Sequence, residues 1–108
     1  MISNENKGGG EKPPFTFTVT LSGDMAQYGP DIRRFVDAMV YKLERNAHKG
    51  RWENLTLSNA FQLLLGEVQE LQEEVNGDQN MVRTMLEAAD VANFALMVAA
   101  IVMERGKQ

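Results

Sequence analysis

We predict an all-α protein from this sequence: a helical bundle with a central antiparallel helix hairpin, completed by dimerisation and preceded by a short extended N-terminal arm. Three observations lead to this class. Three segments repeat their apolar residues at helical spacing. The link between the second and third segments, Asn76-Gly77-Asp78, is short enough to make them antiparallel neighbours. The third segment is apolar around most of its circumference, which is typical of a central helix.

The N-terminal part of the chain lacks helical periodicity. Residues 1–14 are polar and contain three consecutive glycines and a proline pair, which favours a flexible tail. Residues 15–22 alternate apolar side chains with threonines, the period of a β-strand. Because no second clear strand follows, this segment is an extended arm or a strand that pairs with another chain. The apolar members of the alternation are Phe15, Phe17, Val19 and Leu21.

The helical domain is expected over residues 30–105, in three helices. The first runs from Pro30 to Ala47, because proline suits a first helical turn and the apolar residues form one stripe. The second runs from Ser58 to Val75 and ends at Asn76-Gly77, a typical stop signal. The third runs from Gln79 to Glu104, with Asp78 as its expected cap.

The third helix also predicts an oligomer. Its residues from Val91 to Met103 are apolar almost all the way round, and many are alanines that allow close helix approach. One chain of 108 residues with three helices supplies few neighbours to cover such a surface. We therefore expect a homodimer or a homotetramer.

Composition excludes several classes of function. The chain has no cysteine, which excludes disulfides, thiolate zinc sites and cysteine nucleophiles, and its single histidine, His48, excludes multi-imidazole metal sites. The net charge of -4 is unfavourable for binding nucleic acid. No uninterrupted apolar run reaches about 18 residues, and the polar N-terminus is unlike a secretory signal. We expect a cytoplasmic protein that binds neither nucleic acid nor membrane.

Four carboxylates lie where helical spacing places apolar contacts. Glu67 and Glu70 share one side of the second helix and border its apolar face, and Glu87 and Asp90 fall on the apolar face of the third. Burying an unpaired carboxylate costs several kcal/mol, as an order of magnitude. A divalent cation resolves the conflict, and oxygen ligands without imidazole or thiolate select Mg²⁺, Mn²⁺ or Ca²⁺. The alternative for each pair is an ordinary solvated face.

These acids lie in two motifs that resemble a known family. Gly66-Glu67-Val68-Gln69-Glu70-Leu71 and Glu87-Ala88-Ala89-Asp90-Val91-Ala92-Asn93-Phe94 are similar to the E-x-x-E…E-x-x-D signature of the MazG-like all-α nucleoside triphosphate pyrophosphohydrolases. The resemblance covers roughly residues 30–104. Many members have a second glutamate directly before the first acid. Here that position is Gly66, so any role of that extra acid is absent.

The resemblance implies a function. The protein would be an Mg²⁺-dependent nucleotide pyrophosphohydrolase, converting a (d)NTP or a related nucleotide to the monophosphate and pyrophosphate, with Mn²⁺ as a substitute metal. Glu67, Glu70, Glu87 and Asp90 would bind the metal, which engages the triphosphate and helps to activate water. Glu67 or Glu70 would accept the proton of that water, and the sequence does not choose between them.

Candidate substrate-binding residues surround these motifs. Lys42, Arg45 and Lys49 lie along one edge of the first helix and run into the loop that holds Arg51 and Trp52. The same segment of family members is basic and aromatic, so Lys49 is a candidate for a phosphate contact and Trp52 for a base contact. The alternatives are a helix-dipole role for the cations and a core role for the tryptophan.

Two asparagines complete the candidate set. Asn93 is a candidate to bond a ligand carboxylate or the substrate sugar, and Asn59 is a further candidate of the same kind. His48 is expected to be a surface residue rather than a catalyst.

Two other functions compete with this one. In the first, the chain is a non-catalytic helical dimerisation or adaptor module whose acids form only a charged surface groove. In the second, the fold is the same but the substrate is phosphoribosyl-ATP.

Overall fold

The computed structural model describes residues 12–49 and 51–106, and most of the predicted flexible tail lies outside them. Over the described residues the regular elements are all helical, which confirms the all-α class. A 3₁₀ helix, η1 (Gly23–Tyr28), leads into α1 (Gly29–Asn46), which a second 3₁₀ turn, η2 (Ala47–Lys49), follows. The remaining helices are α2 (Leu57–Asn76) and α3 (Met81–Gly106).

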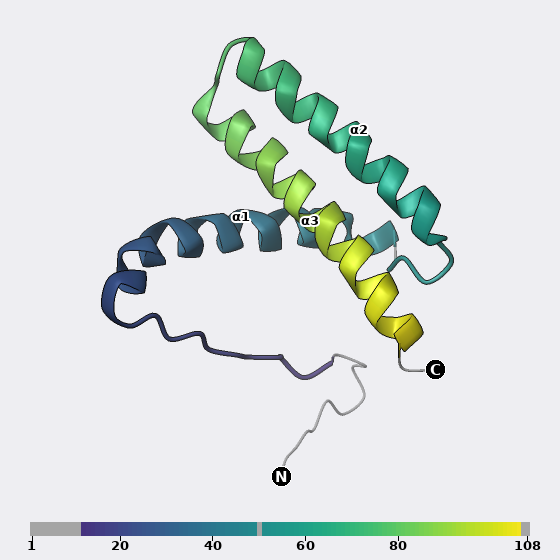
Figure 1. The fold of residues 1–108 in the computed structure, drawn as a ribbon, viewed down its shortest axis with the longest axis horizontal. Helices are drawn as coiled ribbons and strands as arrows, with labels where there is room; N and C mark the ends of the chain where they lie inside the picture. Colours follow the sequence, from purple (N-terminus) through teal and green to yellow (C-terminus); the bar gives the residue numbers. More distant parts are fainter. Residues whose placement is uncertain (1–11, 50, 107–108) are drawn as a thin grey trace.

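Helix α3 is the element on which the other two long helices pack. Helices α2 and α3 run side by side in opposite directions, and α1 crosses α3 at a steep angle (Figure 1). A connection of four residues, 77–80, separates α2 from α3. This arrangement brings one face of α2, one face of α3 and the C-terminal half of α1 to a common region.

Side-chain caps begin two of the helices. Thr56 Oγ1 accepts a hydrogen bond of 3.0 Å from the backbone N–H of Asn59, which satisfies one open donor at the start of α2. At the start of α3, Asn80 Oδ1 accepts one of 2.9 Å from the backbone N–H of Arg83. The prediction that Asp78 caps α3 is wrong, because the left-handed backbone at Gln79 (φ 53°) delays the helix start. Asp78 instead pairs with the Arg83 guanidinium at 3.2 Å.

The apolar core of the described chain is small. Ala60, Met97 and Ile101 are buried together where the first turn of α2 packs on the C-terminal half of α3, near the loop that precedes α2. Many large apolar side chains stay exposed on all three long helices, among them Val36, Val40, Phe61, Leu65, Val68, Leu96, Val102 and Met103. The single chain therefore leaves much of its apolar helix surface in contact with solvent.

The segment before η1 is neither helix nor strand. Residues 12–22 have no regular secondary structure, so the strand alternative for residues 15–22 is not formed within the described chain. Phe15 and Phe17 are 88% and 73% exposed, and their rings contact each other with centroids 6.1 Å apart. This segment lies beneath α1 in the view of Figure 1.

Helix α3 has a second property that follows from its composition. By length and hydropathy alone, Met81–Arg105 is long and apolar enough to cross a membrane. The central helix of a soluble bundle has the same composition, so this property does not separate the two settings.

Candidate functional site

Three carboxylates converge between α2 and α3. Glu67 and Glu70 are three residues apart on α2 and therefore share a face, and Glu87 lies on the facing side of α3. One carboxylate oxygen of each lies within 4.8 Å of those of the other two. Glu67 and Glu87 are half-buried, whereas Glu70 is exposed. Three of the four predicted metal ligands thus meet at one place.

The electrostatics of this cluster are unfavourable to three negative charges. Burial, followed by the charges of Glu70, Asp90 and Glu87, raises the pKa of Glu67. Burial, followed by the charges of Glu70 and Asp90, raises the pKa of Glu87. Lys42 opposes both shifts. The folded chain therefore holds its acids in an arrangement that a nearby cation would stabilise.

The donor set fits a divalent metal ion. Glu87 Oε1 is buried and meets no hydrogen-bond donor in the part of the chain that the structure describes. A buried carboxylate oxygen without a donor is costly, and a cation beside it removes that cost. The cluster offers only oxygen atoms, which suits Mg²⁺, Mn²⁺ or Ca²⁺ rather than softer metals.

Asp90 has a partner of its own. It lies on α3 three residues after Glu87, and its Oδ2 is 3.2 Å from Lys42 Nζ on α1. The two side chains are only 16% and 26% exposed, so solvent screens the pair less than a surface ion pair. Asp90 is thus near the cluster but bound to a lysine. The sequence predicts that Lys42 lies on the same edge of the first helix as other cations, but it does not predict the ion pair with Asp90.

A groove of about 890 Å³ is lined by Glu67, Glu70 and Asp90, though not by Glu87, and by most of the predicted substrate-binding residues. This is within the usual size range of small-ligand pockets, about 300–1,000 Å³. The lining residues come from the loop before α2, from all three long helices and from the N-terminal segment. Its acids are Glu53, Glu67, Glu70 and Asp90; its cations are Lys12, Lys42, Lys49 and Arg51; and its aromatic residues are Trp52 and Phe94.

Trp52 is held in the loop by two local contacts. Its carbonyl oxygen accepts a 3.1 Å hydrogen bond from the backbone N–H of Leu55, and the Arg51 guanidinium lies 4.7 Å from its ring centroid. The indole Nε1 is buried with no acceptor among residues 12–49 and 51–106. Trp52 therefore combines the core role and the groove role that the sequence left as alternatives, since it also packs on the buried cluster.

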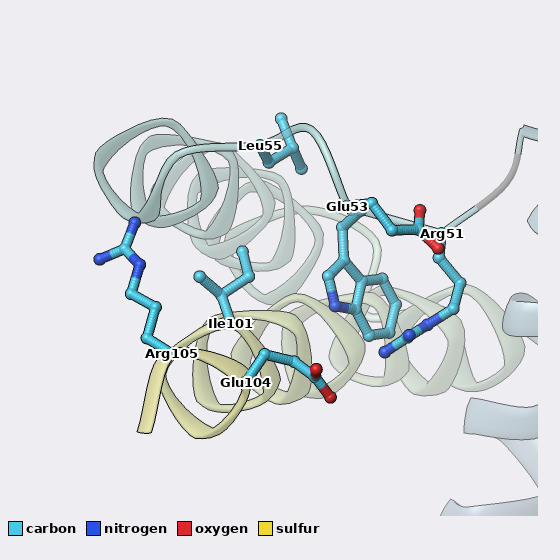
Figure 2. A pocket seen from close by; sticks show the side chains of 7 residues that line it. Arg51, Glu53, Leu55, Ile101, Glu104 and Arg105 are labelled. Atoms are coloured by element: carbon cyan, nitrogen blue, oxygen red, sulfur yellow. The ribbon is translucent and has the colours of Figure 1, made fainter. Parts of the chain in front are cut away.

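A smaller cavity adjoins the same loop. It measures about 400 Å³, and Trp52 lines it as well as the groove. In Figure 2, Arg51, Glu53 and Leu55 of the loop lie opposite Ile101, Glu104 and Arg105 at the C-terminal end of α3. Because both signs of charge border this cavity, it has no clear preference for an anion or a cation.

Asn93 is the most buried polar residue described, at 7% exposure. Its Nδ2 donates a 3.0 Å hydrogen bond to the carbonyl oxygen of Met39, which ties α3 to α1. Its Oδ1 is buried and accepts no bond from any described donor. Asn93 is also one of the residues that line the groove.

One predicted substrate-binding residue lies outside the groove, and one residue that was not predicted lines it. Asn59 is exposed in the first turn of α2 and does not line the groove, and its backbone N–H bonds the cap of that helix. Lys12, in contrast, lines the groove although it lies in the predicted tail. Only its positive charge could have indicated this role, since its position depends on the course of residues 12–22. His48 is exposed in η2, as expected.

No family model matches the chain, and no curated protein and no solved structure matches it either. The likeness of the two acidic motifs to the MazG-like enzymes therefore stays a prediction.

Proposed function

We propose that this protein is a divalent-metal-dependent nucleotide pyrophosphohydrolase that cleaves a (d)NTP or a related nucleotide to the monophosphate and pyrophosphate. The observation that carries the proposal is the convergence of Glu67, Glu70 and Glu87 beside a groove that also holds cations and an indole ring. Acids, cations and an aromatic side chain are the groups needed for a metal ion, a triphosphate and a base, respectively.

The residues have distinct roles in this proposal. Glu67, Glu70 and Glu87 hold Mg²⁺ or Mn²⁺, and Asp90 is the fourth ligand that the resemblance implies. A bound Mg²⁺ neutralises phosphate charge and lowers the pKa of water. Glu67 or Glu70 accepts the proton of the attacking water.

The groove residues bind the substrate itself. Lys49 and Arg51 neutralise the phosphates, and their positions in the same lining as the acids allow this. Trp52 contacts the base, and the Oδ1 of Asn93 accepts a hydrogen bond from the nucleoside. Phe94 and Met97 line the same groove and supply further apolar contacts for a base.

The proposal includes a homodimer or homotetramer in the cytoplasm. Large apolar side chains on α1, α2 and α3 are close to half exposed in the single chain, including Val40, Phe61 and Val102. Soluble monomers rarely expose contiguous apolar surface of more than several hundred Å². A second copy of the same chain would cover these faces.

Product analysis tests the proposed reaction. The purified protein is incubated with Mg²⁺ and each canonical or modified (d)NTP, and with phosphoribosyl-ATP, and the products are separated by anion-exchange chromatography. We expect a monophosphate and intact pyrophosphate, and no reaction in EDTA. A diphosphate with orthophosphate as the primary product would contradict the proposal.

Two substitutions and a matched control locate the reaction. Glu67→Gln and Glu70→Gln should each lower turnover by orders of magnitude with the helical circular-dichroism signal retained. Glu73→Gln removes the same charge from an exposed position of α2 and should leave turnover unchanged.

A non-catalytic dimerisation or adaptor module is the second candidate. The exposed apolar faces and the exposed Phe15 and Phe17 favour it, because both are surfaces for protein contacts. Absence of hydrolysis of every nucleotide, together with a stable oligomer that does not respond to Mg²⁺, would favour this candidate.

A further inference from the structure

We propose that Lys42 is an internal counter-cation of the acidic cluster, which holds Asp90 while no metal is bound and moves to a substrate phosphate when the metal takes Asp90. The proposal rests on the proposed function, because it assigns the order in which that site is filled. It concerns a residue of α1, whereas the metal ligands lie on α2 and α3.

The first step of the argument is the position of Lys42. Its Nζ lies 3.2 Å from Asp90 Oδ2, and it acts on the pKa values of both Glu67 and Glu87. Among the described ion pairs this is the one that joins α1 to α3, whereas the pair Arg83–Glu74 joins α3 to α2. Lys42 therefore supplies positive charge to the cluster from outside the α2–α3 pair.

The second step is the competition for Asp90. Glu87 and Asp90 are three residues apart on α3, so they share a face, and the charge of Asp90 acts on both Glu67 and Glu87. A divalent cation carries twice the charge of an ammonium group, so a metal ion among the three glutamates would compete with Lys42 for the Asp90 carboxylate. Because Lys42 and the metal bind the same carboxylate, each must weaken the binding of the other.

The third step is the destination of Lys42. It lines the same groove as Lys49 and Arg51, which are the proposed phosphate ligands. Its side chain is flexible and partly exposed, so releasing Asp90 leaves an ammonium group in the groove that needs an anion. A nucleotide phosphate supplies that anion. Metal and triphosphate binding then support each other through Lys42.

Calorimetric binding of Mn²⁺ and of a non-hydrolysable α,β-imido nucleoside triphosphate to the full chain tests the proposal. Lys42→Met keeps the length of the side chain but removes its charge. We expect Mn²⁺ alone to bind this variant about fivefold to tenfold more tightly than the wild type, a coupling of ordinary size. We expect the triphosphate, in the presence of Mn²⁺, to bind about tenfold more weakly, because one charged hydrogen bond to phosphate is lost.

Two further variants separate this role from a general effect of charge. Arg45→Met removes a positive charge from the same helix at an exposed residue that contacts Tyr41, and it should leave the Mn²⁺ affinity nearly unchanged. In an Asp90→Asn background, Lys42→Met should no longer tighten Mn²⁺ binding. If the tightening persists in that background, or if Arg45→Met reproduces it, Lys42 does not act through Asp90 and the proposal is wrong.

The outcomes for the two proposals are distinct. If the wild type binds Mn²⁺ and hydrolyses nucleotides but Lys42→Met changes neither affinity, the counter-cation proposal fails and the proposed function stands. If Mn²⁺ and the nucleotide bind with the expected opposite shifts but nothing is hydrolysed, the counter-cation proposal stands and the reaction fails. If neither the wild type nor Lys42→Met binds Mn²⁺, both proposals are overturned. Circular dichroism of each variant verifies that the helices are intact.

Discussion

Replacing Glu87 by glutamine tests the carboxylate cluster directly, because the metal-free and metal-bound states predict opposite effects on stability. The carboxylate oxygens of Glu67, Glu70 and Glu87 lie within 4.8 Å of one another. At that separation two full charges repel by about 0.9 kcal/mol in water and about 3.5 kcal/mol at an effective dielectric constant of 20. Glu87 also buries an oxygen that meets no donor in the described chain.

Without metal, Glu87→Gln should therefore stabilise the protein. Solvent at the exposed Glu70 and the positive charge of Lys42 offset some of the repulsion, so we expect a gain of about 1 kcal/mol rather than the sum of two full repulsions. For a domain of this size that corresponds to a rise in Tm of roughly 4–8 °C. With millimolar Mg²⁺ the order should reverse, because the wild type binds the ion more tightly than the variant.

The measurement is differential scanning calorimetry of the wild type, Glu87→Gln and Glu73→Gln in EDTA and in MgCl₂, at one protein concentration. Glu73→Gln makes the same charge change on the exposed side of α2 and should follow the wild type in both solutions. The reasoning is refuted if Glu87→Gln is less stable than the wild type in EDTA, or if Mg²⁺ leaves the wild-type Tm unchanged.

Three further predictions concern pH, assembly and the groove. The pKa values of Glu67 and Glu87 are raised in the folded state, so the folded state binds protons more tightly than the unfolded chain. The resulting contribution to folding stability is fully present below the ordinary carboxyl pKa and is lost as pH rises through the raised pKa values. The metal-free Tm should thus fall with rising pH across that window, and saturating Mg²⁺ should flatten the fall; a metal-free Tm that rises there would contradict the assigned shifts. Ala99→Glu places a charge on an exposed position of α3 and should convert an oligomer to monomers in light scattering, with loss of activity; a monomeric, fully active wild type would exclude the oligomer. Trp52 is the only tryptophan and lines the groove, so adding a nucleotide with Mg²⁺ should change its fluorescence in a saturable way; an unchanged spectrum would place the base elsewhere.

The local sequence pattern was sufficient to predict the three long helices. The three predicted helices agree with α1, α2 and α3 to within about two residues at each end, an ordinary uncertainty for helix limits. Helix periodicity, the proline near the start of α1 and the glycine after α2 all act between residues a few positions apart. The cap of α3 was missed because the choice between Asp78 and Asn80 depends on the backbone angle at Gln79, which no residue type specifies.

Which charged side chains pair with each other could not be predicted from local sequence. The spacing of Glu67, Glu70 and Glu87 placed each on the correct helix face, since a face is a local property of three or four residues. Whether Asp90 faces the glutamates or Lys42 depends on where α1 crosses α3, and Lys12 reaches the groove only through the course of the segment before η1. Asn59 lies on the same side of α2 as Leu63 and Glu70, but it is one turn before Leu63, the first α2 residue that lines the groove. Sequence determined the helices and the acids on them, because those depend on neighbours along the chain. Tertiary structure decided which charge meets which, because the offset and crossing of helices are set by packing between residues that are distant in sequence.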